Sequence, residues 1–484
     1  MRRLSLFCLT LTLFAASPLL AQPDSLWSRT YGGSGFDYCM SLLPTADGGY
    51  ALAGHTNSFG AGDTDFWLLR TDENGDSLWS HTYGGLGEDY CYSLIQTADG
   101  GFALAGETHS FGAEEENFWL LRTNENGDSL WSRVYGSSGH DGCQSLIQTM
   151  DGGFALAGWT NSFGSGRLDF WLVRTDENGD SLWSRTFGGE DHDLCTSLVQ
   201  TADGGFALAG DTWSFGAGGY DFWLIRTSEN GDSLWSHTYG GLDVDRCCSL
   251  VQTADRGYAL VGWTDSFGAG ISDSWLVRTD ENGDSLWSRT YGGESGDGGY
   301  SLIQTSDGGF ALAGGTYSFG AGGNDFWLVR TDENGDSLWS RSYGGESEDV
   351  CWSLVQTADR GYALAGLTSS FGAGANDFWL IKLGPENSVP DAEATTPLQF
   401  GLDAVYPNPF NSQAVSSYKL QVTSQIELGL YDLSGRLVQT LAEGWQEAGS
   451  HQAVIDGTQL PSGVYLLKLT DGKQSALSKV CLLK

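Results

Sequence analysis

The chain has 484 residues and a formal net charge of −37, from 61 acidic and 24 basic residues. This excess of negative charge repels phosphate backbones and anionic lipid headgroups, so it argues against nucleic acid or lipid as a direct partner. The 70 glycines and 13% aromatic residues favour many short strands joined by tight turns over helices.

Residues 1–22 have the pattern of a signal peptide. Arg2 and Arg3 supply the positive start, residues 4–14 form an apolar run, and small residues such as Ala21 offer a cleavage site. The alternative, a transmembrane anchor, is weaker because the run is too short to cross a bilayer comfortably. The sequence therefore predicts an exported chain with no membrane span.

Tryptophans recur every 52 residues in two series. One series is Trp27, Trp79, Trp131, Trp183, Trp235, Trp287 and Trp339, and the other is Trp67, Trp119, Trp171, Trp223, Trp275, Trp327 and Trp379. Seven copies at one spacing indicate a repeat architecture. We interpret the fourteen tryptophans as core residues between neighbouring repeats.

Each copy contains four runs typical of β-strands. In the second copy the runs are residues 93–97, 102–108, 118–123 and 129–136, bounded by Gly, Asp and Asn. The Asn-Gly dipeptide between the third and fourth runs predicts a hairpin with a type I′ turn. One four-stranded antiparallel sheet cannot bury both of its faces alone, so neighbouring sheets must stack on it.

The phase of the repeats indicates a closed ring. Residues 25–31 form a fourth strand with no third strand before it, and residues 378–383 form a third strand with no fourth after it. The first strand can therefore complete the last sheet, whereas an open array would leave exposed edges. The sequence predicts an all-β fold, a seven-bladed β-propeller at residues 23–384 closed by its N-terminal strand.

Alternate connections of such sheets emerge at opposite ends of the ring. The hairpins between third and fourth strands carry sixteen carboxylates, beginning with Asp72, Glu73 and Asp76. Oxygen ligands suit calcium, but the hairpins are too short for a spaced ligand set, so a solvated edge is the favoured interpretation. We expect no metal or other cofactor, with calcium as the alternative.

The copies differ at the opposite end, around a threonine that closes the second strand. There we expect ligand-binding candidates, because exposed aromatic rings near a polar rim suit sugars or peptide side chains. The alternative is drift in solvent-exposed loops. The candidates are His55, Trp159, Trp213, Trp263 and Tyr317.

Two further sets occupy one position in several copies. An aspartate precedes the innermost strand in every copy, where it could rim the axial channel and hold a cation or, as we favour, cap its own turn. The set is Asp37, Asp89, Asp141, Asp193, Asp245, Asp297 and Asp349. The cysteines at position 39 and its equivalents show no metal-ligand spacing, and we expect small buried side chains.

No catalytic arrangement emerges from the residues. None of the seven histidines lies in a metal-ligand motif, and no set of blade-specific side chains directed at the axis was identified. The motif TDENGDSLWSR resembles the tryptophan motif of quinoprotein dehydrogenase propellers, without counterparts to the residues that hold their quinone and metal. We therefore expect a protein that is not an enzyme.

A polar, proline-bearing linker at residues 385–400 leads to residues 401–484, where short alternating runs predict a small immunoglobulin-like β-sandwich. The blocks VYPNPFN, LYDLSGRLVQTL and the final LPSGVYLLKLTDGKQSALSKVCLLK resemble the C-terminal sorting domain of type IX secretion substrates. A plain module of the flagellar-hook-capping type is the alternative. The resemblance implies contact with the type IX machinery and delivery to the surface of a Gram-negative cell.

The repeats, with their YGG, DFWL and GD-LW elements, resemble those of secreted bacterial propeller proteins, a resemblance that implies the fold and no activity. We expect a monomeric secreted or cell-surface protein that binds an extracellular glycan or protein. The alternatives are a polysaccharide-active or quinoprotein-like enzyme and a structural spacer without ligand.

Overall fold

The computed structural model describes residues 25–112, 115–386, 401–402, 405, 410, 413–420, 424–446, 449–458 and 460–482. The predicted signal peptide, residues 1–22, lies outside the described residues, as does the predicted linker from residue 387 on. The chain divides into two compact units, Met1–Val389 and Pro390–Lys484. The described residues contain no helix long and apolar enough to cross a membrane.

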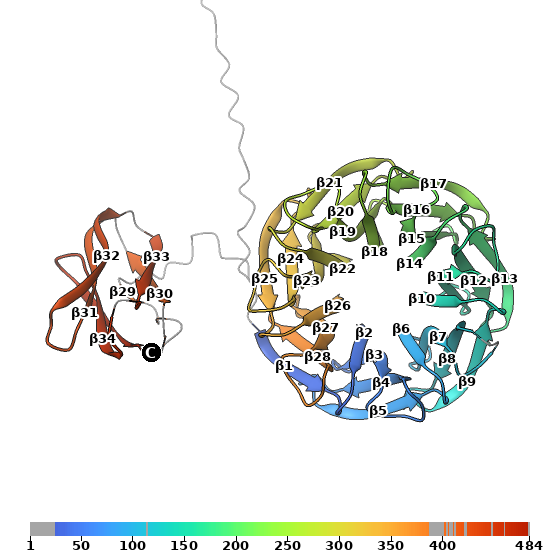
Figure 1. The fold of residues 1–484 in the computed structure, drawn as a ribbon, viewed down its shortest axis with the longest axis horizontal. Helices are drawn as coiled ribbons and strands as arrows, with labels where there is room; N and C mark the ends of the chain where they lie inside the picture. The colour runs from blue at the N-terminus through green and yellow to red at the C-terminus, as the bar shows by residue number, and fades with distance from the viewer. Residues whose placement is uncertain are drawn as a thin grey trace, which may run out of the picture. The chain divides into compact units, whose positions relative to one another are not determined.

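The described part of the first unit forms seven four-stranded antiparallel sheets, the blades of a propeller, arranged in a ring (Figure 1). The innermost strands are β2 (Asp37–Pro44), β6 (Asp89–Gln96), β10 (Asp141–Gln148), β14 (Asp193–Gln200), β18 (Asp245–Gln252), β22 (Asp297–Gln304) and β26 (Asp349–Gln356). The second strands are β3 (Tyr50–Thr56), β7 (Phe102–Thr108), β11 (Phe154–Thr160), β15 (Phe206–Thr212), β19 (Tyr258–Thr264), β23 (Phe310–Thr316) and β27 (Tyr362–Thr368).

The third strands are β4 (Asp65–Thr71), β8 (Asn117–Thr123), β12 (Asp169–Thr175), β16 (Asp221–Thr227), β20 (Asp273–Thr279), β24 (Asp325–Thr331) and β28 (Asp377–Leu383). The outermost strands are β5 (Ser77–Tyr83), β9 (Ser129–Tyr135), β13 (Ser181–Phe187), β17 (Ser233–Tyr239), β21 (Ser285–Tyr291), β25 (Ser337–Tyr343) and β1 (Ser25–Tyr31). Blades 1 to 6 follow the chain from β2–β5 to β22–β25, and blade 7 contains β26, β27, β28 and β1.

Blade 7 joins the two ends of the propeller sequence. β1 runs antiparallel to β28, with Tyr31 opposite Phe378 and Ser25 opposite Leu383. Phe378 and Leu380 of this blade share a core with Trp67 and Leu69 of blade 1, so blade 7 also packs against blade 1. The predicted all-β, seven-bladed propeller of 52-residue repeats is confirmed.

The core lies in the seams between blades. Every residue of β11 except Trp159 is buried, because both faces of the strand are covered. Phe154 and Leu156 pack in the seam toward blade 2, whereas Ala155 and Ala157 pack toward blade 4. Because side chains alternate along a strand, the large ones pack against the preceding blade and the small ones against the following blade. One repeated sequence therefore fills every seam.

The two tryptophan series are buried to different extents. The series containing Trp171 is only 3–5% exposed, and Trp171 contacts Phe118 of blade 2 with ring centroids 4.5 Å apart. The outer series is half-buried apart from Trp339, because its strand forms the rim of each blade. Trp131, for example, meets Phe154 of blade 3 edge-on at 5.9 Å. Both series therefore pack between neighbouring blades, as the sequence predicted, with the outer series less deeply buried.

The hairpins between third and fourth strands differ from the predicted type I′ turn. The amide of Gly75 donates to Asp72 O, and Gly75 has a φ of 78° while Asn74 is not in the positive region. The Asp72 carboxylate also accepts the amides of Asn74 and Asp76. This side-chain capping favours a type I turn followed by a glycine bulge, in which only the glycine needs positive φ.

The innermost strands begin earlier than the sequence runs suggested. β6 starts at Asp89 rather than residue 93, with a shift of register between Cys91 and Ser93. This bulge interrupts the alternation of apolar residues and so hides the first half of the strand from periodicity.

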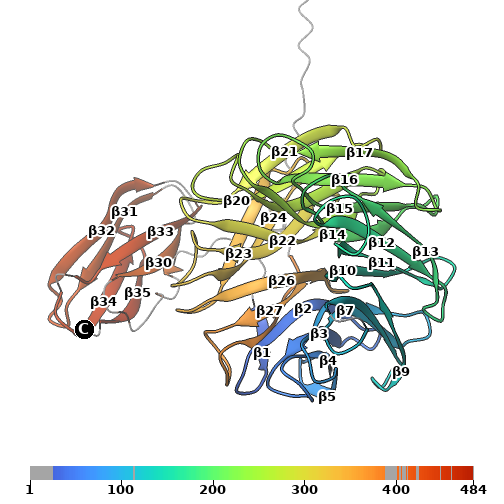
Figure 2. The same ribbon diagram turned by 45° about the vertical axis from the view of Figure 1, so that its right-hand side comes forward.

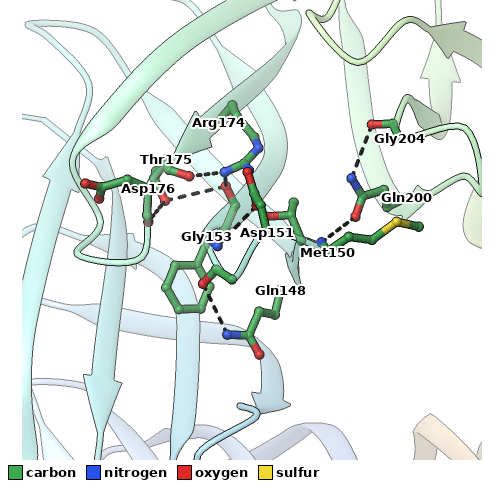
Figure 3. Close-up of polar contacts among 12 residues, drawn as sticks. Gln148, Met150, Asp151, Gly153, Arg174, Thr175, Asp176, Gln200 and Gly204 are labelled. Atoms are coloured by element: carbon green, nitrogen blue, oxygen red, sulfur yellow. Dashed lines mark hydrogen bonds and ion pairs between the residues drawn. The ribbon is translucent and has the colours of Figure 1, made fainter.

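We call the end of the propeller that carries these hairpins and the turns between first and second strands the hairpin end. There Arg174 donates from Nη1 to the carbonyls of Phe154 and Thr175 and from Nη2 to Asp151, as Figure 3 shows. The amide of Met150 donates to Gln200 Oε1 of blade 4 at 3.0 Å, which ties adjacent blades. Equivalent arginines of blades 1 to 6, and Lys382 in blade 7, pair with an aspartate in the same way.

The second unit consists of two antiparallel sheets, shown in red in Figure 2. One contains β29 (Gly401–Leu402), β30 (Gln413–Leu420) and β33 (Gly449–Asp456), and the other β31 (Ser424–Tyr431), β32 (Leu437–Gln446), β34 (Gly463–Thr470) and β35 (Ser475–Leu482). Residues of both sheets, among them Tyr418, Ile455, Leu428 and Leu467, share one buried core. This is the predicted small β domain, and β35 is a strand that the runs did not identify.

Candidate functional site

The opposite end of the propeller, the loop end, carries the loops between second and third strands and those between blades. Its framework is a repeated aspartate cap. In blade 1 the Asp37 carboxylate accepts the hydroxyls of Thr56 and Ser58 and the amide of Gly33. The same cap forms around Asp89, Asp141, Asp193, Asp245, Asp297 and Asp349.

These seven aspartates are buried, so the proposed acidic ring at the rim of the channel is wrong. Their carboxylates accept the hydroxyls and amides of the adjoining turn, as the favoured capping interpretation predicted, and they lie out of contact with solvent. The caps hold the last residues of the second strand in place, and those residues include the predicted binding candidates.

His55 is not an accessible contact. It is 9% exposed, stacks on Tyr38 with centroids 5.1 Å apart and meets Tyr90 of blade 2 edge-on at 5.0 Å. Burial lowers the pKa of His55 to about 4, so the imidazole is neutral at physiological pH. It fills the seam between blades 1 and 2, and its prediction as a ligand contact is wrong.

Trp159 and Trp213 are accessible and lie on successive blades. Trp159 is half-buried because its ring lies across Gly142, and it lines an open depression of about 660 Å³ with His140, Arg167 and His192. Trp213 is 50% exposed and contacts Tyr220 at 4.8 Å.

Trp263 and Tyr317 line a second, smaller pocket of about 250 Å³ together with Tyr300. Tyr317 is 53% exposed, and its hydroxyl donates to Glu348 Oε2 at 2.9 Å. The five predicted residues thus occupy five blades: the structure brings Trp263 and Tyr317 together, leaves Trp159 and Trp213 as separate contacts, and buries His55.

Sequence reasoning missed variation on the innermost strands. Their second residues are Tyr38, Tyr90, Gly142, Leu194, Arg246, Gly298 and Val350, and their fourth are Met40, Tyr92, Gln144, Thr196, Cys248, Tyr300 and Trp352. Several contact the variable residues of the second strands across a seam: Arg246 Nε donates to Asp211 Oδ2 at 2.8 Å. These innermost-strand residues therefore add a second set of blade-specific side chains to the one predicted on the second strands. Comparing the two columns of the aligned repeats would have found them.

Blades 2 and 3 hold a cluster of acidic and histidine side chains. Tyr92 donates to Glu107 Oε1 at 3.0 Å, while Glu116 contacts His109 at 3.1 Å and His140 at 2.8 Å. Burial, with a contribution from the charge of Glu116, raises the pKa of Glu107 to about 7. The hydrogen bond to Glu116 raises the pKa of His140. Glu107 can thus exchange a proton near neutral pH.

Within the described residues, no three His, Cys, Asp or Glu side chains gather in a metal-binding arrangement. The hairpin carboxylates of Asp72, Asp176, Asp280 and Asp332 accept amides of their own turns. The cysteines at position 39 and its equivalents are free thiols buried in the seams, as expected.

Residues 404–482 match the family described as the secretion system C-terminal sorting domain. This domain indicates export by type IX secretion to the cell surface or the extracellular space. The type IX resemblance noted in the sequence is confirmed. Comparison with curated proteins finds no match.

Three solved structures resemble this chain, each with a low TM-score and low sequence identity. A fungal alcohol oxidase of the AA5 family, in complex with copper, has a TM-score of 0.47 and 13% identity, covering 96% of this chain and 100% of its own. Sqt1 from Chaetomium thermophilum has a TM-score of 0.42 and 13% identity, covering 72% and 82%. PorZ, a surface component of the type IX secretion system of Porphyromonas gingivalis, has a TM-score of 0.37 and 10% identity, covering 93% and 74%. At these values the likenesses carry no argument about function.

Proposed function

We propose that this protein is a secreted or cell-surface binding propeller that recognises an extracellular glycan through its loop end. The observation that carries the proposal is the contrast between a repeated frame and blade-specific side chains set into it. In all seven blades the aspartate cap recurs, whereas the residue before the capped threonine is His55, Glu107, Trp159, Asp211, Trp263, Gly315 or Leu367. A stabilising role would favour one residue type at that position.

The accessible aromatic rings favour sugars among the possible ligands. Trp159, Trp213, Trp263 and Tyr317 come from four blades, and all four side chains are partly exposed at the loop end. The face of an aromatic ring packs well on the apolar face of a sugar, and the indole or phenol group adds a hydrogen bond at its edge. The net charge of −37 opposes strongly anionic polymers, so neutral glycans fit best.

The test is a glycan array probed with the mature protein and with a Trp159/Trp213/Trp263 triple alanine variant. We expect wild type to bind a defined set of neutral glycans and the triple variant to lose that binding. The matched control replaces Leu78, Leu130 and Leu182, exposed apolar residues of the outer strands, by alanine and should bind as wild type does. Equal binding by wild type and the tryptophan variant would remove the proposal.

A polysaccharide-active enzyme is the second candidate, favoured by Glu107. A carboxyl group with a pKa of about 7, hydrogen-bonded to Tyr92, is suited to general acid chemistry near neutral pH. Incubation of wild type and Glu107→Gln with neutral and uronic polysaccharides, followed by chromatography of the products, separates the candidates. Products from wild type but not from Glu107→Gln would support the enzyme, and intact polymers would remove it.

A further inference from the structure

The sixth copy departs from the others where the second strand meets the innermost strand. Gly298 of β22 lies opposite Gly315 of β23 in the sheet register. The corresponding pairs elsewhere are Tyr38–His55, Tyr90–Glu107, Gly142–Trp159, Leu194–Asp211, Arg246–Trp263 and Val350–Leu367. Blade 6 alone has no side chain at either position. In blade 3 the space above Gly142 is filled by Trp159, whereas in blade 6 the Tyr300 ring lies over Gly298 and the Asn324 amide lies over Gly315.

The two glycines, the Tyr300 ring and the Asn324 amide all line a pocket of about 250 Å³ between blades 5 and 6. Its walls are three aromatic rings from two blades: Trp263 at the end of β19, Tyr300 on β22 and Tyr317 just after β23. The pocket is smaller than the roughly 300–1,000 Å³ that hold drug-sized ligands, so it has room for one ring rather than an extended chain.

One polar group in the pocket has no partner. The side chain of Asn324 lines the pocket and is 7% exposed, and its Oδ1 makes no hydrogen bond within the described structure. A Cβ on Gly315 would lie 2.5 Å from that oxygen, so glycine is what allows the amide to occupy this place. A buried acceptor without a donor is unfavourable. The oxygen has less than 1 Å² of exposed surface, so a ligand hydroxyl would satisfy it once the amide turns toward the pocket.

The two carboxylates near the pocket, Asp297 and Glu348, already accept hydrogen bonds from the protein. Asp297 accepts the hydroxyls of Thr316 and Ser318 and the amide of Gly293. Glu348 accepts the Tyr317 hydroxyl at the exposed rim. No Lys, Arg or His lines the pocket, so nothing in it would neutralise a uronic, sialic or phosphorylated ligand.

We propose that this pocket binds a single neutral pyranose unit, stacked on the aromatic walls and donating one hydroxyl to Asn324 Oδ1. The inference rests on the proposed glycan-binding function and assigns it to one place on the loop end. The aromatic walls select a ring with an apolar face, the free amide oxygen requires a donor, and the absence of a basic residue excludes anionic sugars.

The test titrates the mature protein with neutral methyl pyranosides (glucoside, galactoside, mannoside and N-acetylglucosaminide) by ligand-observed NMR and calorimetry. We expect saturable binding of at least one of them. Trp263→Ala and Tyr317→Ala should each weaken it about tenfold or more, since each removes a stacking wall. Gly315→Leu should abolish it, because it introduces the residue that blade 7 carries at this position and fills the pocket.

Matched variants keep the test decisive. Leu286→Ala removes an exposed apolar side chain of β21, on the same blade as Trp263 but away from the loop end, and should leave methyl pyranoside binding unchanged. Thermal unfolding checks that Gly315→Leu is folded, and if it is not, Tyr317→Ala decides, because Tyr317 is largely exposed. Tetramethylammonium is the competing probe, since an aromatic box also suits such a cation. Binding of that cation with no binding of any pyranoside would overturn the inference.

The two proposals fail differently. If a glycan bound on the array is lost in Trp159→Ala or Trp213→Ala but unaffected by Gly315→Leu and Trp263→Ala, the pocket assignment is wrong while glycan binding stands. If wild type binds no glycan on the array and no methyl pyranoside, both are wrong.

Discussion

The two ends of the propeller have the same backbone but treat their charged groups in opposite ways. At the hairpin end, Asp151 is held by the Thr149 hydroxyl and by Arg174, and its pKa is lowered. The same direction holds for Asp47, Asp99, Asp203, Asp255, Asp307 and Asp359. At the loop end, burial raises the pKa of Glu107 to about 7 and that of Asp211 to about 6.

This difference in pKa separates carboxylates that stabilise the folded state from carboxyl groups that destabilise it. A carboxylate with a lowered pKa stabilises the folded state in its charged form, and it recurs in every blade of the hairpin end. A buried carboxyl with a raised pKa destabilises the folded state at neutral pH. Glu107 and Asp211 each occur in one blade only, whereas the raised pKa of Asp65, a turn-capping aspartate, is repeated at Asp221, Asp273 and Asp325. Residues kept for binding or chemistry are expected to destabilise the fold and to occur in one blade only, as Glu107 and Asp211 do.

The largest effect should come from breaking the frame that both ends share. Trp171→Ala should lower the free energy of unfolding by about 3–5 kcal/mol, because it empties a buried site in a seam. Trp327→Ala should cost about 0.5–1.5 kcal/mol less, since Ser274 replaces the phenylalanine that contacts every other tryptophan of this series. Urea unfolding measures both, and equal losses would mean that the missing ring contributes nothing.

Removing the Glu107 charge should remove the loss of stability that this buried carboxylate causes at neutral pH. The folded pKa of about 7 lies above the ordinary 4.5, so stability is lost as pH rises between these values. Glu107→Gln should therefore raise the free energy of unfolding at pH 8 by about 2–3 kcal/mol and give no gain at pH 4. Glu177→Gln on an exposed hairpin is the control, and a similar gain there would contradict the assignment.

A smaller effect tests the hairpin end itself. Arg174→Met should cost about 1–2 kcal/mol, because the carbonyls of Phe154 and Thr175 and the Asp151 carboxylate lose their donor. Arg174→Lys should cost less, since blade 7 carries Lys382 at this position, with Nζ 2.9 Å from Asp359 Oδ2 and 2.7 Å from Leu383 O. Equilibrium unfolding at pH 7 compares the three proteins. If lysine and methionine cost the same, the ion pair is not what stabilises this end.

The sequence by itself determined the architecture, because its signals are local and repeated. The 52-residue spacing, the strand runs and the unpaired strands at 25–31 and 378–383 follow from periodicity and from the need to pair edges, and the sorting motifs of the tail are contiguous. Errors were confined to places where a side chain or a bulge altered a local rule, as with the capped hairpin at Asp72 and the shifted register of β6.

The candidate site was decided only by the tertiary structure. His55 and Trp159 stand at the same position of their repeats. His55 is buried between a tyrosine of its own blade and one of the next, whereas Trp159 lies open over Gly142. The pocket beside Asn324 is lined by two glycines, seventeen residues apart in sequence, that lie opposite each other in one sheet, and by a tryptophan of the preceding blade. The exposure of a side chain and its contacts depend on which residues meet across the seam between two blades. The sequence of a single repeat contains only one side of that seam.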